Sequence, residues 1–235
     1  MKAELDTLID SVAKTNRRRS LDTLKKLHEA SKLQFGWIEF LSHRVKGTPG
    51  EVLLTGAHSA VIEAAACVAV GFFRPALTAM RCQIDLFLGT AYYESHEVEW
   101  KYYNETGDQF RLKSDLVDYF KKYNQAYKTR FSLLYENRSN AARLGKLDIY
   151  GILSAHVHAM GVKTKPSATR LAEVIQEIDP EQIVALQRDV AESVSDYLAC
   201  WYHASWNDLP KSVKDNVFSR LSEAQQTKFF AQSPS

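Results

Sequence analysis

The sequence predicts an all-α protein, an irregular helical bundle with long central helices that forms a single helical domain over residues 1–235. Apolar residues recur at helical spacing along most of the chain, whereas strand-like alternation of useful length, internal repeats and low-complexity tracts are not found. The chain is 45% hydrophobic and 25% charged, which is typical of a globular protein long enough to bury its own core.

The N-terminal segment is expected to form two helices. A short amphipathic helix ends before the basic run Arg17–Arg19, which we interpret as a solvent-exposed run. Its apolar stripe is Leu5, Leu8, Ile9 and Val12. A single long helix is then expected from an N-cap at Ser20 until the sequence Gly47-Thr48-Pro49-Gly50 breaks it.

Two central helices follow. The segment Glu51–Val70 is rich in alanine, so neighbouring helices can approach it closely, and Gly71 precedes a break. Pro75 suits a first helical turn, and the apolar spacing after it predicts a helix that reaches the neighbourhood of Tyr92. An acidic aromatic segment, Glu94–Tyr103, comes next.

The second half alternates loops and helices. Asn104–Lys113 is expected to be a loop, and Ser114 to cap one helix whose aromatic stripe continues to Leu134. Asp148 opens a short helix that includes Met160 and should stop at Gly161. A loop around Pro166 then leads to a short helix at Ala168–Ile178.

The last long helix is expected to begin with Asp179 as N-cap and Pro180 in the first turn. Its apolar residues keep the helical repeat as far as Trp201, and a break is expected at Asn207–Pro210. The remaining residues are expected to be helical as well.

Several features favour a cytoplasmic protein. The three cysteines Cys67, Cys82 and Cys200 are an odd number in apolar stretches, which favours buried free thiols. Met1–Asp10 contains three acidic residues and lacks the apolar run of a signal peptide. The apolar stretch Val61–Leu88 is interrupted by charged residues, so we interpret it as core and expect no membrane partner.

The sequence also argues against several classes of enzyme. It contains no phosphate-binding glycine loop, no paired-cysteine zinc spacing and no Glu-x-x-His pair, so we expect neither a metal nor a cofactor. His156 and His158 lie two residues apart on a helix and point in directions about 200° apart, which disfavours a shared metal ion. The net charge of +2 is too small to demand a nucleic-acid partner.

The short helix after Asp148 carries the main candidate site. Tyr150, Ser154 and His158 follow the i, i+4, i+8 spacing and should form a polar ridge beside its apolar face. His158 is either a structural histidine with a hydrogen-bond partner or a ligand contact and proton carrier. His156 falls on the apolar face, where a neutral histidine is expected.

A second candidate lies on the helix after Pro75. Arg81 falls inside an apolar stripe with Asp85 one turn later, and this order of charges is the less favourable one for an isolated helix. Arg81 should therefore have partners on other helices, either Glu63 or the ridge of Ser154 and His158. The pair either specifies packing or recognises a ligand.

Basic residues flank the short helix. They are Arg138, Arg143 and Lys146 before it and Lys163, Lys165 and Arg170 after it, with Asp148 between them. These flanks form either a solvated loop face or a surface for phosphate or RNA, in which Arg143 and Lys163 are candidate binding residues.

The string Tyr150-Gly-Ile-Leu-Ser-Ala-His-Val-His158, together with Arg81-x-x-x-Asp85, resembles helical proteins of the HEPN superfamily. The resemblance covers these two short segments and the helical layout. It implies a ribonuclease or toxin of bacterial defence and stress systems, or a non-catalytic helical partner, commonly dimeric. The family's nuclease motif, an arginine shortly before a histidine, is absent, since none of the seven histidines has a suitably placed upstream arginine.

Two functional hypotheses follow. The first is a non-catalytic helical binding or regulatory protein in bacterial stress or phage defence, acting as a homo-oligomer or with a protein partner. The alternative is an RNA-directed nuclease or toxin in which His158 is the acid or base and Arg81 holds phosphate. Under either hypothesis the candidate binding residues are Asp85, Tyr150, Ser154, Glu63, Arg143 and Lys163.

Overall fold

The computed structural model describes residues 2–18, 21–108, 110–138, 148–160, 164–175 and 179–231. Every regular element among these residues is helical, which confirms the predicted all-α class. In chain order the elements are α1 (Lys2–Arg18), α2 (Leu21–Ala30), α3 (Lys32–Arg44), α4 (Pro49–Val70), α5 (Phe73–Tyr93), α6 (Glu97–Thr106), α7 (Lys113–Tyr123), α8 (Gln125–Glu136), α10 (Ile149–Val157), the 3-10 helix η2 (Leu171–Val174), α11 (Pro180–Trp201), the 3-10 helix η3 (His203–Asp208), α12 (Lys211–Arg220) and α13 (Glu223–Phe230).

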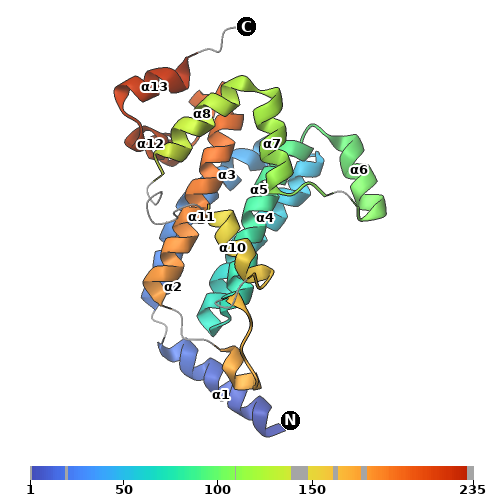
Figure 1. Ribbon diagram of the computed structural model, residues 1–235, viewed down its shortest axis with the longest axis vertical. Helices are drawn as coiled ribbons and strands as arrows, with labels where there is room; N and C mark the ends of the chain where they lie inside the picture. The colour runs from blue at the N-terminus through green and yellow to red at the C-terminus, as the bar shows by residue number, and fades with distance from the viewer. Residues whose placement is uncertain are drawn as a thin grey trace.

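Helices α4, α5 and α11 form the centre of an elongated molecule (Figure 1). The chain reverses from α4 into α5 at Gly71, whose φ of 88° is a left-handed conformation that glycine adopts without strain. Small residues on α4, among them Ala57 and Ala64, are buried and let α5 pack along it. Most of α5 and most of α11 are buried, so these helices supply the core on which the others pack.

A ring of three glutamine side chains joins α3, α5 and α11 inside the core. Gln34 Nε2 donates to Gln83 Oε1 over 2.8 Å, and Gln187 Nε2 donates to Gln34 Oε1 over 2.7 Å. Gln83 Nε2 donates to the carbonyl of Ala60 on α4 over 3.1 Å. Because none of the three amides is more than 2% exposed, their mutual hydrogen bonds replace those with water.

The two predicted central helices are confirmed, with α4 starting at Pro49 and α5 at Phe73. Among the described residues, α4 is also the one helix long and apolar enough to cross a membrane by length and composition. It packs here against α5, α1 and α3. The acidic aromatic segment forms α6, which projects from the body (Figure 1).

The prediction of one long helix after Ser20 is wrong, because the helix is interrupted at Ser31, between α2 and α3. The Ser31 hydroxyl donates to the carbonyl of Leu27 over 3.0 Å, a back-bond that bends helices. The bend allows α2 and α3 each to pack against α11.

The prediction of a single helix from Ser114 to Leu134 is also wrong, because this segment forms two helices. Asn124 is extended, with φ −139° and ψ 96°, and separates α7 from α8. Its side-chain oxygen accepts a hydrogen bond from the backbone N–H of Tyr127 over 2.8 Å, so it caps the second helix.

The expected helix at Ala168–Ile178 is shorter than predicted. In residues 168–175 the structure contains only the 3-10 helix η2, and residues 176–178 lie outside the described part. The Glu173 carboxylate accepts from the backbone N–H and the hydroxyl of Thr169 over 2.8 and 3.1 Å and so holds a local turn.

Helix α10 begins as predicted, with Asp148 as N-cap, but it ends at Val157, before the expected stop at Gly161. Gly161 lies outside the described residues. Ala159 has a φ of 51°, so the backbone leaves the helical conformation just after His158.

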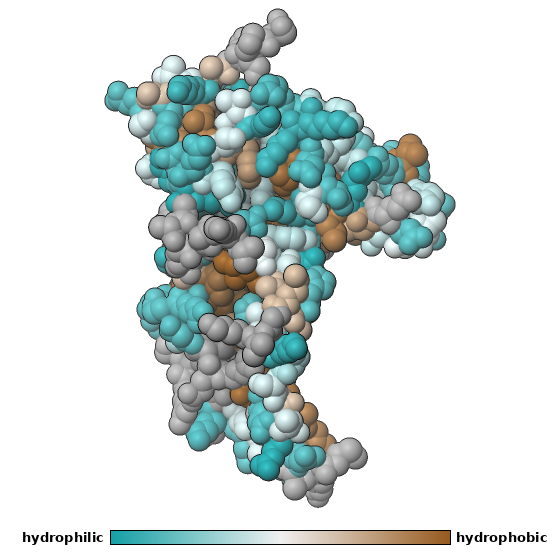
Figure 2. Space-filling view, in the orientation of Figure 1, coloured by the Kyte–Doolittle hydropathy of each residue, from teal (hydrophilic) through white to brown (hydrophobic). Residues whose placement is uncertain are grey.

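The visible surface is mostly hydrophilic, with apolar surface in a hollow in the middle of the view and smaller apolar patches on the projecting parts (Figure 2). On α1 the exposed apolar residues are Leu5 and Ile9, and on α6 they are Val98 and Tyr102. These residues leave both projecting helices with an apolar face in solvent.

Candidate functional site

A polar cluster lies between α5 and α10, where the sequence predicted one. Arg81 Nη2 donates to the Tyr150 hydroxyl over 2.9 Å, and the guanidinium lies 5.0 Å from the centre of the Tyr150 ring. The Tyr150 hydroxyl donates to Asp85 Oδ2 over 3.3 Å. Arg81, Tyr150 and Asp85 therefore form one connected group across two helices.

Asp85 also holds the start of α7. Its Oδ1 accepts a hydrogen bond from the backbone N–H of Lys113, the first residue of that helix, over 2.9 Å. The preceding residue, Leu112, has no side chain able to cap α7, so a carboxylate from α5 takes that role. Burial raises the pKa of Asp85, whereas the hydrogen bond from Lys113 and the charge of Arg81 lower it.

The side chain of Lys113 links α7 to α10. Its ammonium lies 2.5 Å from Asp148 Oδ2, and Asp148 Oδ1 accepts from the backbone N–H of Gly151 over 2.9 Å. Burial alone would raise the pKa of Asp148, but the Lys113 ammonium holds it below its usual value. Burial would lower the pKa of Lys113, yet the neighbouring Tyr197 and Asp148 raise it above its usual value. The pair is therefore ionised at neutral pH.

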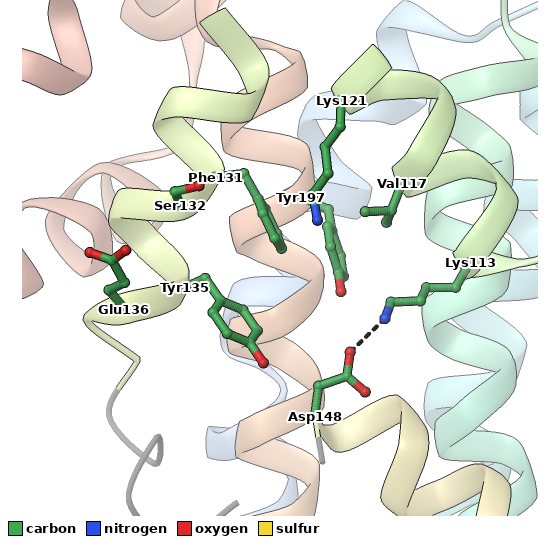
Figure 3. A pocket seen from close by; sticks show the side chains of 9 residues that line it. All are labelled: Lys113, Val117, Lys121, Phe131, Ser132, Tyr135, Glu136, Asp148 and Tyr197. Carbon is green, nitrogen blue, oxygen red and sulfur yellow. Dashed lines mark hydrogen bonds and ion pairs between the residues drawn. The ribbon is translucent and has the colours of Figure 1, made fainter. Parts of the chain in front are cut away.

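Lys113 and Asp148 also line a pocket of about 250 Å³ (Figure 3). Its walls are α7 on one side and α8 on the other, while Tyr197 of α11 forms the back. Lys113, Val117 and Lys121 lie four residues apart along α7, and Phe131 and Tyr135 lie four residues apart on α8. The turn at Asn124 brings these two helix faces opposite each other.

Lys121 is the second cation of the pocket, and its ammonium lies 4.8 Å from the centre of the Phe131 ring. The described part of the chain offers it no carboxylate at ion-pair distance, although Asp118 lies on the same helix. Burial lowers the pKa of Lys121, the charge of Asp118 raises it, and the charge of Lys113 lowers it; the net shift is downward. An anion beside Lys121 would raise this pKa again.

The aromatic wall of the pocket has a buried cation behind it. The Phe131 and Tyr197 rings are stacked, with centroids 5.0 Å apart and an interplanar angle of 10°. The guanidinium of Arg138 lies 4.9 Å from the centre of the Tyr135 ring, and its Nε donates to Asp196 Oδ2 over 2.8 Å. Among the described residues, its two buried terminal nitrogens have no hydrogen-bond partner.

Comparisons with models of protein families, with curated proteins and with solved structures find no match to this chain.

Two predicted site residues lie apart from the cluster, and two lie outside the described residues. His158 is exposed and caps the C-terminus of α10, where its backbone N–H donates to the carbonyl of Ser154 over 2.9 Å. Glu63 is exposed on α4 and accepts from the Ser59 hydroxyl over 2.8 Å, so the partner of Arg81 is Tyr150 instead of Glu63 or His158. Arg143 and Lys163 lie outside the described residues.

Ser154 remains a candidate contact of the cluster. In the described part of the chain, its buried hydroxyl oxygen has no hydrogen-bond partner, and neither has Nε of Arg81. A buried hydroxyl without a partner is unfavourable by about 1 to 3 kcal/mol, so a group that bonds Ser154 would be stabilised there.

Arg74, which no sequence pattern singled out, fixes the other end of α10. Its Nη2 donates to the backbone carbonyls of His156 over 2.5 Å and Val157 over 3.2 Å, two of the carbonyls that a helix C-terminus leaves unpaired. Burial and the charge of Arg74 lower the pKa of His156, and its ring lies edge-on to Phe73. His156 is thus neutral in an apolar setting, as expected.

No metal centre is assembled in the described part of the chain, where no three histidine, cysteine or acidic side chains gather in one place. The pocket is lined by the ammonium groups of Lys113 and Lys121, the carboxylates of Asp148 and Glu136, tyrosine hydroxyls that can donate hydrogen bonds, and aromatic side chains.

Proposed function

We propose that the protein is a non-catalytic helical binding or regulatory protein that takes a small anion into the pocket between α7, α8 and α11. The observation that carries the proposal is the half-buried ammonium of Lys121, which lies in an aromatic-walled cavity and has no ion-pair partner among the described residues. Lys113 is already paired with Asp148, so its charge is balanced within the protein. An incoming anion would gain a charge-assisted hydrogen bond from Lys121.

Anion binding is tested by thermal unfolding in inorganic phosphate against chloride at equal ionic strength. Ligand binding to the folded state alone stabilises it by RT ln(1 + [L]/Kd), which is about 1.4 kcal/mol at ten times Kd. For a domain of this length, that corresponds to a rise of roughly 3 to 6 °C in Tm. We expect such a rise in the unmodified protein and its loss in Lys121→Gln.

Lys122→Gln is the matched control, since it removes the same charge from the adjacent, exposed position of α7. It should keep the full effect of phosphate. An equal loss in both variants would mean that phosphate acts through general surface charge and would contradict a site at Lys121.

The nuclease or toxin alternative receives less support from the geometry. It requires Arg81 and His158 to meet at one phosphate, but the Arg81 guanidinium is bound at Tyr150. His158 lies eight residues after Tyr150, which is about 12 Å along the axis at the rise of an α-helix. A stress or phage-defence setting and a homo-oligomer or partner complex remain proposals that rest on the HEPN resemblance. Light scattering of the purified protein tests the oligomer.

A cytoplasmic location belongs to the same proposal. It is supported by the free thiols of Cys67, Cys82 and Cys200, of which Cys200 is fully buried in the core.

A further inference from the structure

We infer that the ligand of this pocket is a small aromatic anion, meaning one planar ring that carries a single carboxylate or phosphate group. The inference rests on the anion-binding function proposed above and adds the ring and the size limit. Three properties of the pocket carry it: its balance of charge, its aromatic walls and its volume.

The charge balance leaves one cation to neutralise. The Lys113 ammonium and the Asp148 carboxylate cancel each other, whereas Lys121 has no ion-pair partner in the described residues. Glu136 also borders the pocket, but Figure 3 shows its carboxylate on the outer side of α8, away from the lysines. One anionic group of the ligand therefore suits the site better than several.

The walls are suited to a flat apolar group. Phe131, Tyr197 and Val117 are 5%, 1% and 5% exposed and form a closely packed apolar base, so the aromatic surface open to a ligand is that of Tyr135. Tyr135 stands at the mouth, 42% exposed, with its ring 5.8 Å from that of Phe131. A bare inorganic anion would leave the Tyr135 ring in solvent, whereas a planar ring packed on it would gain about 0.5 to 1.5 kcal/mol beyond burial.

The volume limits the ligand to a single ring. A cavity of about 150 Å³ is known to hold benzene, and this pocket has about 250 Å³. The remainder is roughly 100 Å³, close to three or four water-sized volumes, which suits one carboxylate or phosphate group. A nucleoside or a long acyl chain would extend beyond the pocket.

Isothermal titration with phenyl phosphate, benzoate, inorganic phosphate and phenol tests the inference at matched ionic strength. Phenyl phosphate or benzoate is expected to bind at least about tenfold more tightly than inorganic phosphate, and more tightly than phenol. The affinities of phenyl phosphate and benzoate show whether the site prefers a phosphate or a carboxylate group. Lys121→Gln should weaken the binding at least about tenfold, while Lys122→Gln should leave it unchanged.

Tyr135→Leu provides a second variant that does not depend on the lysine. Because Tyr135 is exposed at the mouth, its replacement should leave the fold intact and reduce only the preference for aromatic ligands. Its affinity for phenyl phosphate should fall several-fold and its affinity for inorganic phosphate should not change.

The outcomes separate this inference from the proposed function. If inorganic phosphate binds as tightly as phenyl phosphate, and both depend on Lys121, anion binding stands and the aromatic ligand is refuted. If phenol binds as tightly as phenyl phosphate whether or not Lys121 is present, the anionic group is refuted, and anion binding with it. Absence of binding by all four compounds overturns both.

Discussion

Replacing Asp196 with asparagine removes the negative charge that two buried arginines share. Asp196 is 0% exposed and accepts from Arg138 Nε over 2.8 Å and from Arg220 Nη2 over 2.5 Å, while Glu192 accepts from Arg220 Nη1 over 3.2 Å. In the intact protein these two cations and two anions balance. Asp196→Asn keeps the volume of the side chain but leaves one uncompensated buried positive charge.

Breaking a buried ion pair by removing one partner is unfavourable by about 3 to 5 kcal/mol. For a domain of this size, Asp196→Asn should therefore lower Tm by roughly 6 to 20 °C. The loss is measured by urea unfolding followed by circular dichroism at pH 7. Asp215→Asn is the control, since its pair with Lys211 is exposed and should contribute less than about 1 kcal/mol.

A second variant separates charge from shape. Combining Asp196→Asn with Arg138→Met removes a cation together with the anion, so the double variant should lose less stability than the sum of the two single changes. The reasoning would be refuted if Asp196→Asn lost less than about 1 kcal/mol or if the two effects were simply additive.

Three further predictions concern other parts of the molecule. Burial and the neighbouring Arg130 lower the pKa of His203 to about 4, so stability should fall as pH drops from about 6.5 towards 4. Between pH 7 and 5, the free energy of unfolding of His203→Phe should fall by roughly 1 kcal/mol less than that of the unmodified protein. Urea unfolding at both pH values measures this difference, and the same fall in both proteins would contradict the prediction. Gln83→Leu should destabilise the fold by about 2 to 3 kcal/mol, because it leaves buried amides without partners. Replacing all three glutamines of the ring with leucine should destabilise the fold less per substituted residue than Gln83→Leu alone. An equal loss of stability per residue would argue against this explanation. Cells that express the double variant Arg81→Ala, His158→Ala should show the same growth and the same RNA integrity as cells that express the unmodified protein. Toxicity of the unmodified protein that is lost in this variant would favour the nuclease alternative.

The helical class and the main helices could be predicted because they depend on local spacing and on caps that the sequence shows. Asp179 with Pro180 begins α11 as predicted, whereas α4 begins at Pro49, two residues before the expected Glu51. The breaks at Ser31 and Asn124 were missed because the apolar spacing continues across them. In each case one polar side chain bonds to the backbone and ends or bends the helix, which helical periodicity does not reveal.

The candidate site was predicted in part, for the same physical reason. Arg81 in an apolar stripe indicated a charge directed inward, and the structure pairs it with Tyr150 of the predicted ridge. The distant end of that ridge, His158, fell outside the cluster because α10 ends at Val157 and its last residues turn towards solvent. Helical spacing alone does not fix where a helix ends.

The pocket could not have been found from spacing, because its two walls become opposed only after the turn that the sequence analysis missed. Lys113, Val117 and Lys121 resemble an ordinary amphipathic face, as do Phe131 and Tyr135. With one continuous helix these groups would extend along a rod, and Lys121 would point into solvent. The extended conformation of Asn124 folds α8 back beside α7 and places Lys121 over the Phe131 ring. Loss of the Asn124 cap should therefore weaken ligand binding at Lys121 as well as the start of α8, although Asn124 does not line the pocket.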